Sequence, residues 1–274
     1  MRSEKISPAL GAIIYDIDIS QPLSNAEMAE IRALWLEHIV IVIRDQTLTP
    51  QQQLDFATRI GSPQPYPLLN GLDGFDMITP VLKREDETVN FGGLWHSDTT
   101  YQPKPPMATM LHARELPPIG GDTLFSNQYR AYETLSEGMK EALRGLKVVC
   151  ISGKGKAAAT RVNRIAENGA NVDEAQLVGI HPVVRTHPET GRKALFVNEG
   201  HASHFEGWTS DESAGLLSYL YQHIIREEFQ CRLVWKTGDV ALWDNRCVLH
   251  YPVNDYHGYR RLLHRITLAG DVPR

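Results

Sequence analysis

The sequence predicts an α+β protein with a mainly β core, in which helices pack outside a closed or sandwiched antiparallel sheet. Most strand-like runs crowd into the second half of the 274 residues, without the regular intervening helices of a doubly wound parallel sheet. Capping motifs mark only a few helices. No internal repeat, low-complexity tract or linker divides the chain, so we expect a single domain over residues 1–274.

Capping motifs and apolar spacing predict four helices. In a capping box, a Ser or Thr before the helix and a Glu or Gln three residues later bind each other's backbone N–H groups. Ser24 with Glu27 and Thr209 with Glu212 have this spacing, and apolar residues follow both at helical intervals. The other two predicted helices run from Thr49-Pro50 to Gly61 and from Tyr129 through Ser136 to Leu146.

Runs rich in Val, Ile, Leu and Trp, separated by Gly, Pro, Asn and Asp, predict the strands. The predicted strands are residues 39–43, 147–152, 180–185, 194–197, 232–235, 239–243, 247–251 and 262–268. Residues 153–176 lack such a run, and we expect them to form an irregular excursion over one mouth of the sheet.

Composition argues against several classes of partner. The chain has 28 Lys+Arg and 33 Asp+Glu, a net charge of 28 − 33 = −5, so no nucleic-acid partner is expected. No membrane partner is expected either, because the apolar run at 39–43 is far shorter than the roughly 20 residues of a spanning helix. Cys150, Cys231 and Cys247 form no C-x-x-C pair, which predicts buried thiols in a reducing, cytoplasmic setting.

A His-x-Asp motif, His96 and Asp98, is the first indication of chemistry. In an extended segment, residues two apart point to the same side, so both side chains could meet one metal ion. An imidazole and a carboxylate are two of the three ligands of the 2-His-1-carboxylate facial triad. His250, at the end of an apolar strand, is the candidate third ligand, whereas His201 and His204 are expected at the surface. The alternative is a surface His beside a surface Asp.

Two arginines, Arg261 and Arg265, follow His250 on the last predicted strand. Their even offset places both on one face of that strand, about 13 Å apart at about 3.3 Å per residue. Arginine on a buried strand is costly unless it meets an anion, so the pair indicates an anion pocket near the metal. An exposed basic edge strand is the alternative, and spacing alone leaves both interpretations open.

These segments resemble the taurine/2,4-D dioxygenase (TauD/TfdA) family of Fe(II)/2-oxoglutarate enzymes. The shared order is a His-x-Asp motif, a distal His, an Arg eleven residues later and a second Arg four residues after that. Further similar stretches are Asp16-Ile17-Asp18, Trp95 to Tyr101, Pro105-Pro106, Gly120 to Phe125, Gly238 to Arg246, Asp255-Tyr256 and His264. The resemblance implies a double-stranded β-helix, or jelly roll, with flanking helices.

The resemblance also implies a role for each candidate residue. His96, Asp98 and His250 would hold Fe(II), leaving coordination positions for 2-oxoglutarate and O2. Arg261 would pair with the distal carboxylate of 2-oxoglutarate, and the Thr123 hydroxyl would donate a second hydrogen bond to it. Substrate hydroxylation would accompany conversion of 2-oxoglutarate to succinate and CO2. Halogenating relatives lack the carboxylate at the position of Asp98, so hydroxylation is expected here.

The substrate is expected to be a small anionic organic molecule, aryloxyalkanoate-like or another carboxylate or sulfonate, whose anionic group Arg265 would bind. Taurine enzymes of the family carry a substrate-binding histidine in the loop after the second helix, and no histidine lies between His38 and His96. The remaining candidate substrate contacts are Tyr66, Leu68, Leu69, Phe91, Thr99 and Phe205. For the apolar ones, plain core packing is the alternative.

A homo-oligomer is also expected. A second functional hypothesis is a non-catalytic jelly-roll protein that binds a metal or an organic anion without turnover. The intact His-x-Asp, distal His and both arginines favour the enzyme, because a pure binding module has no need for open metal positions.

Overall fold

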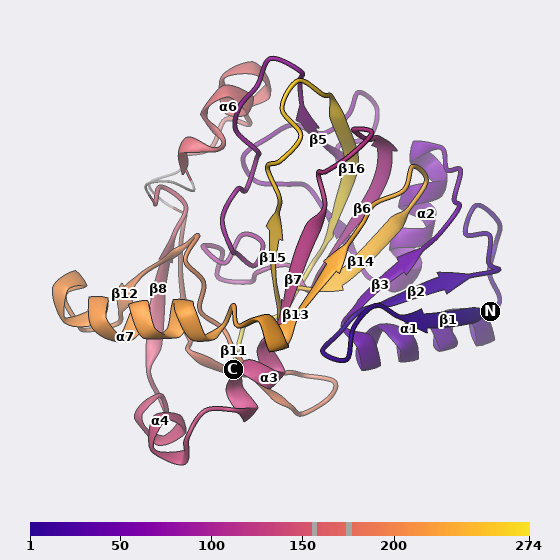
Figure 1. Cartoon of the computed structure of the whole chain (residues 1–274). Coiled ribbons are helices and arrows are strands. Elements are labelled where there is room, and N and C mark those ends of the chain that lie inside the picture. Colours follow the sequence, from indigo (N-terminus) through magenta and orange to yellow (C-terminus); the bar gives the residue numbers. More distant parts are fainter. Residues whose placement is uncertain (155–157, 174–176) are drawn as a thin grey trace.

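The computed structural model describes residues 1–154, 158–173 and 177–274, and its architecture is mixed α+β with mainly sheet (Figure 1). The helices are α1 (Asn25–His38), α2 (Pro50–Ile60), α3 (Gln128–Glu133), α4 (Glu137–Ala142), α6 (Val162–Asn168), α7 (Ser210–His223) and a 3₁₀ helix at Glu227–Phe229. The strands are β1 (Arg2–Lys5), β2 (Ala12–Tyr15), β3 (Val40–Ile43), β4 (Pro63–Gln64), β5 (Thr79–Lys83), β6 (Ala108–Glu115), β7 (Thr123–Asn127), β8 (Lys147–Ile151), β9 (Val178–Pro182), β10 (Val184–Thr186), β11 (Lys193–Leu195), β12 (Ala202–Phe205), β13 (Gln230–Leu233), β14 (Val240–Asp244), β15 (Val248–Pro252) and β16 (Arg261–Leu268). None of the described helices combines the length and apolarity needed to cross a membrane.

The largest sheet joins strands from both ends of the chain. Its order is β1-β2-β3-β14-β6-β16-β4, and β5 also pairs with β16. Its pairings are antiparallel except that of β2 with β3, which are parallel and connected through α1. Strand β14 lies between β3 and β6, so the N-terminal strands and the C-terminal third share one sheet (Figure 1).

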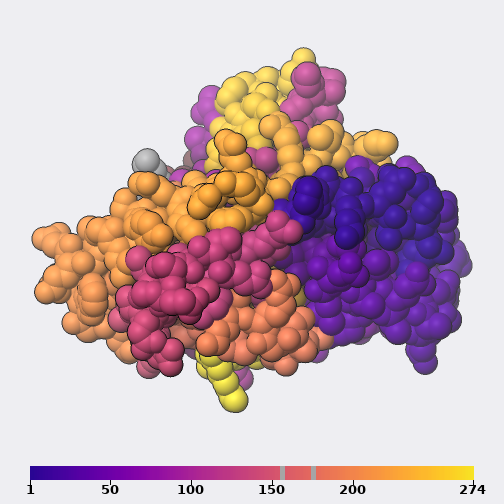
Figure 2. Space-filling model, turned by 60° about the horizontal axis from the view of Figure 1, so that its bottom comes forward, coloured from indigo at the N-terminus to yellow at the C-terminus, as the bar shows by residue number. Residues whose placement is uncertain are grey.

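Two apolar cores lie on the two faces of this sheet. On β14, Val240 and Leu242 pack with helices α1 and α2, whereas Ala241 and Trp243 belong to the core shared with β7, β13 and β15. This alternation follows the two-residue period of a strand. Because both faces are covered, the strand is apolar at nearly every position. Figure 2 shows the N-terminal quarter of the chain as a contiguous block on one side of the molecule.

Three of the four predicted helices form as expected. Both capping boxes are present, and Thr49 with Gln52 makes a third at the start of α2. The prediction of one helix from Tyr129 to Leu146 is wrong, because Ser136 accepts from the Met139 N–H and starts α4 after a break. A Ser that binds the backbone in this way favours a new N-terminus over continuation.

Several strand predictions need correction. The chain leaves α1 with Ile39 in the left-handed conformation (φ 56°), so β3 starts one residue later than predicted. Residues 180–185 form two strands, β9 and β10, because Val183 interrupts the ladder to donate to the Leu146 carbonyl. Strands β5, β6 and β7 were not predicted as strands, and they carry or flank the candidate site. Part of the predicted irregular segment 153–176 is helix α6, while residues 155–157 and 174–176 lie outside the described residues.

A buried ion cluster ends β14. Asp244 is fully buried, accepts two hydrogen bonds from the Arg246 guanidinium and accepts a third from His187 Nε2 at 3.0 Å. Burial alone would raise the pKa of Asp244, but these donors lower it from 3.8 to about 2. Because the pKa is lower in the folded state, the carboxylate stabilises the fold at neutral pH.

We therefore expect the free energy of unfolding to fall as the pH drops from about 4 toward 2, measured by urea denaturation at a series of pH values. The Asp244→Asn variant should lose about 3–5 kcal/mol at pH 7, because Arg246 is left buried beside a neutral amide. Its unfolding free energy should also vary less over this acidic range than that of the wild type. An Asp244→Asn protein as stable as wild type at pH 7 would contradict the assignment.

Candidate metal centre and its two cavities

A pair of backbone hydrogen bonds brings the His-x-Asp motif to the distal histidine. The His96 N–H donates to the His250 carbonyl at 3.1 Å, and the His250 N–H donates back to the His96 carbonyl at 2.8 Å. His250 lies on β15, whereas His96 lies in the long connection between β5 and β6. This isolated antiparallel bridge joins segments that are more than 150 residues apart in the sequence.

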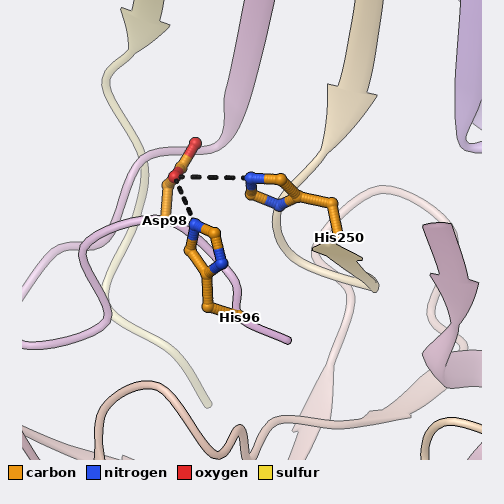
Figure 3. Close-up of side chains that lie close together, drawn as sticks. All are labelled: His96, Asp98 and His250. Atoms are coloured by element: carbon orange, nitrogen blue, oxygen red, sulfur yellow. Dashed lines mark ion pairs between the residues drawn. The ribbon is translucent and has the colours of Figure 1, made fainter. Parts of the chain in front are cut away.

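The three predicted metal ligands converge on one point (Figure 3). Asp98 Oδ1 lies 3.6 Å from His96 Nε2 and 3.9 Å from His250 Nε2, and all the ligand atoms lie within 4.8 Å of one another. The motif is not the extended segment that the sequence predicts. Only His96 forms a bridge, and Asp98 begins a turn in which Thr99 has a φ of 41°.

A hydrogen bond on the side of the ring away from Asp98 fixes the orientation of the His96 imidazole. Its Nδ1–H donates to the Leu94 carbonyl at 2.7 Å, which leaves the lone pair of Nε2 facing Asp98. Two glycines make room for this side chain. A Cβ at Gly200 would lie 2.9 Å from the His96 Cβ, and one at Gly92, where φ is +72°, would lie 3.0 Å from ring atom Cε1.

A chain of hydrogen bonds holds the other oxygen of Asp98. The Thr109 hydroxyl on β6 donates to Asp98 Oδ2 and accepts from Asn245 Nδ2 at 2.8 Å. The Asn245 Oδ1 in turn accepts from the indole N–H of Trp243 at 2.9 Å. Such support orients a ligating carboxylate and keeps it ionised.

Burial and charge set the protonation of Asp98 and His250. Burial would raise the pKa of Asp98, but His250, His96 and Arg265 together hold it below its ordinary value, so the group is a carboxylate. Burial lowers the pKa of His250 to about 3, so its ring is neutral at pH 7. Neutral imidazoles and an ionised carboxylate are the forms that bind a metal.

A cavity opens on one side of the triad. Arg261 and Thr123, the residues assigned to 2-oxoglutarate by resemblance, both line it with the three ligands. Among the described residues, Nε and Nη2 of Arg261 have no hydrogen-bond partner although the side chain is buried. Thr123 Oγ1 accepts from the Trp235 indole N–H at 3.0 Å, which leaves its own proton free to donate.

A second cavity shares His96 and Asp98 with the first. Arg265 and Phe91 line both cavities, and Tyr66 and Thr99 line the second. The Arg265 guanidinium lies 4.0 Å from the centroid of the Tyr66 ring, and its Nε and Nη2 have no partner among the described residues.

The other candidate substrate contacts lie elsewhere. Leu68 and Leu69 pack together in the apolar cluster behind Tyr66, and Phe205 belongs to the core beneath α7. These positions agree with plain core packing, the alternative given for apolar residues of this kind.

The last strand decides between the two interpretations of its arginines. Strand β16 pairs with β6 on one side and with β4 and β5 on the other, so it is not an edge strand. Arg261 and Arg265 are 4% and 6% exposed, and both face the first cavity. The interpretation of this strand as an exposed basic edge is therefore wrong, and the interpretation of the two arginines as part of an anion-binding pocket remains.

The sequence did not indicate three further residues of the second cavity: Tyr101, Arg161 and His201. His201 was expected at the surface, but it is 4% exposed, and burial lowers its pKa well below the ordinary value. Its Nδ1 lies 2.9 Å from the Thr100 hydroxyl, and its ring packs edge-on against Tyr101. The polar stretch that contains it has no periodicity from which this burial could be predicted.

The donor set fits a first-row divalent metal. Two imidazole nitrogens and one carboxylate oxygen on one side of an open cavity are typical of non-haem Fe(II) sites. A second cluster, of His187, Asp244 and Cys247, fits less well. Arg246 already neutralises its carboxylate, and both ring nitrogens of His187 make hydrogen bonds.

Comparisons with known proteins agree with this chemistry. The family model described as taurine catabolism dioxygenase TauD, TfdA family matches residues 2–267. An alpha-ketoglutarate-dependent 2,4-dichlorophenoxyacetate dioxygenase from Cupriavidus pinatubonensis is 34% identical, over 97% of each chain. An alkylsulfatase from Acinetobacter baylyi is 33% identical, over 99% of this chain and 86% of its own.

Solved structures give the same result. A taurine dioxygenase from Burkholderia xenovorans superposes with a TM-score of 0.83 at 33% identity, over 99% of this chain and 90% of its own. The structure of AAD-2 in complex with Mn(II) and N-oxalylglycine has a TM-score of 0.83 at 25% identity, over 99% of both chains.

The Thr109→Val variant tests the support of Asp98. Removing the hydroxyl takes a hydrogen-bond donor from Asp98 and leaves the Asn245 side-chain amide without its acceptor. We therefore expect the affinity for Mn(II), measured by calorimetric titration, to fall roughly 10–100-fold. Thr267→Val is the matched control. Thr267 lies opposite Thr109 on β16, and its hydroxyl donates to the Gln64 carbonyl away from the triad. Equal Mn(II) affinities of the two variants would rule out the proposed support.

Proposed function

Because the chain belongs to the taurine catabolism dioxygenase TauD, TfdA family, whose members are 2-oxoglutarate-dependent dioxygenases using Fe(II) and O2, we propose that it hydroxylates a small anionic organic substrate. One observation carries the proposal. His96, Asp98 and His250 bring their ligand atoms together where two cavities meet, and each cavity contains a buried arginine whose Nε and Nη2 have no partner among the described residues.

In this proposal the residues of the first cavity bind and orient 2-oxoglutarate. Fe(II) held by His96, Asp98 and His250 would supply the oxidative chemistry, in which O2 is consumed and 2-oxoglutarate becomes succinate and CO2. Arg261 would form an ion pair with the distal carboxylate, and the free proton of Thr123 would donate to the same group. The apolar walls formed by Val81, Leu111 and Leu263 would exclude water.

The second cavity would hold the primary substrate. Arg265 is its candidate anion-binding residue, because its Nε and Nη2 are buried and have no hydrogen-bond partner in the part of the chain that the structure describes. Tyr66, Phe91 and Tyr101 give this cavity aromatic walls, which suit an apolar body attached to the anionic group. Thr99 would contact the substrate beside Asp98, whereas a contact from Leu69 would need the substrate to reach behind Tyr66.

The proposed substrate class is an aryloxyalkanoate-like acid or another carboxylate or sulfonate. Relatives of this chain are named for 2,4-dichlorophenoxyacetate, (S)-phenoxypropionate and sulfate esters. Taurine is disfavoured because no histidine lies between His38 and His96. Turnover of a panel of such acids, read as succinate formation, tests the class.

Further features belong to the same proposal. The core that the large sheet shares with strands β13, β7 and β15 supports a double-stranded β-helix. The large sheet joins both ends of the chain, which supports a single domain over residues 1–274. A cytoplasmic location is supported by three free, buried cysteines. We also propose that the protein forms a homo-oligomer, which size-exclusion chromatography with light scattering tests.

Replacing any triad ligand should abolish Fe(II)-dependent turnover, because two ligands do not hold the ion in a reactive arrangement. We expect Asp98→Ala, His96→Ala and His250→Ala each to lose succinate formation in the presence of substrate. An Asp98→Ala protein with normal hydroxylation would show that the triad is misassigned. A wild-type protein that binds Fe(II) and 2-oxoglutarate without turning over any acid of the panel would instead favour the non-catalytic binding protein.

The Arg265→Gln variant should separate substrate binding from co-substrate use. Loss of the guanidinium removes the proposed partner of the substrate anion but leaves Arg261 in place, so hydroxylation should stop while slow, substrate-independent succinate formation persists. Succinate is measured with and without substrate, over a series of acids and their neutral amides. If wild type converts the amides as fast as the acids, Arg265 does not bind a substrate anion.

A further inference from the structure

Lys83 is a buried lysine in the first cavity for which neither the fold nor the proposed reaction gives a role. It is the last residue of β5, is 3% exposed and lines the cavity together with Arg261 and the metal ligands. Among the described residues, its Nζ has no hydrogen-bond partner. A buried ammonium without a partner is costly, so its position indicates a ligand that the protein itself does not supply.

Lys83 and Arg261 form one doubly charged patch. They lie directly opposite each other in the antiparallel pair of β5 and β16, so their β-carbons are about 4.5–5.5 Å apart on one face. Both cations stack on the same ring: Lys83 Nζ lies 4.1 Å and Arg261 Cζ 5.8 Å from the centroid of Tyr256. Like charges directly opposite each other destabilise a sheet unless an anion lies between them.

The carboxylates whose charges act on Lys83 and Arg261 are engaged elsewhere. Glu87 accepts from Arg164 and from the backbone N–H of Arg84. Asp122, on the side of Arg261, accepts from Arg232 Nε at 2.6 Å. Burial is the main cause that lowers the pKa of Lys83; the charge of Glu87 raises it by less, and the charge of Arg261 lowers it by a smaller amount still. The patch therefore keeps an excess of positive charge that an anionic ligand would offset.

We infer that Lys83 forms a second ion pair with the distal carboxylate of 2-oxoglutarate, beside Arg261, and thereby makes the site selective for a dicarboxylate co-substrate. The inference rests on the proposed function, because it needs that carboxylate to lie at Arg261. An ammonium adds a point charge to the planar guanidinium, so the two cations together bind both oxygens of the carboxylate. A 2-oxo monocarboxylate gains nothing from either cation.

The test compares two co-substrates that differ only in the distal group. The full-length protein, loaded with Mn(II) in the absence of O2, is titrated calorimetrically with 2-oxoglutarate and with 2-oxopentanoate, which has the same carbon chain without the distal carboxylate. Lys83→Met should weaken 2-oxoglutarate binding about tenfold or more and leave 2-oxopentanoate binding unchanged. Lys83→Arg should retain most of the discrimination. The melting temperature of the ligand-free Lys83→Met protein should equal or exceed that of wild type, because the variant removes a buried charge that has no hydrogen-bond partner among the described residues.

Lys140→Met is the matched control, because Lys140 also stacks over a tyrosine ring, that of Tyr132, but on α4 and outside the cavity. It should bind both acids as wild type does. Unchanged 2-oxoglutarate binding in Lys83→Met, or an equal loss for both acids, would overturn the inference. The Arg261→Gln variant distinguishes failure of the inference about Lys83 from failure of the proposed function. If it loses 2-oxoglutarate selectively while Lys83→Met does not, the proposed function stands and only the inference fails. If wild type does not bind 2-oxoglutarate, the proposed function fails.

Discussion

The two backbone hydrogen bonds between His96 and His250 are the constraint on which the rest of the site depends. They fasten an irregular connection to β15, a strand that pairs with β7, so that one histidine comes from a loop and the other from a sheet. The third candidate ligand is tied to the other sheet, because Asp98 accepts from Thr109 on β6 of the large sheet. A triad held by both sheets keeps its geometry without a metal, which is the condition for selective binding.

Charge is the second constraint, and it works against folding. The two cavities bury Lys83, Arg261 and Arg265 with donors that no described residue accepts, while Asp98 is their one carboxylate. Such an arrangement costs stability in the ligand-free protein and is typical of sites that bind anions. The buried cluster around Asp244 shows the contrast, because there every charge has a partner within the chain.

Local signals predicted the helices well, because a capping box is complete within four residues, as at Ser24 and Thr209. The metal triad was predicted from motif order and resemblance, since its ligands are chemically distinctive. Lys83, Thr109 and His201 could not be predicted, because their roles come from tertiary pairing. Lys83 matters only through its register with Arg261, and no spacing within the sequence encodes that register. Strands β5 and β6 were missed for a related reason: polar residues that face the site interrupt their apolar runs.

The two glycines against His96 determine where the pocket can be redesigned. Gly92 and Gly200 both line the second cavity, yet a β-carbon at Gly200 would collide with His96, and one at Gly92, where φ is +72°, would crowd its ring. In a mutant library that randomises every cavity residue, some of the variants would therefore have a displaced His96. Tyr66 and Phe91 line the same cavity through side chains that the triad does not need for its own packing. Tyr66 and Phe91 are therefore the positions at which directed evolution could change the substrate scope. Natural changes in substrate preference would arise at the same two positions.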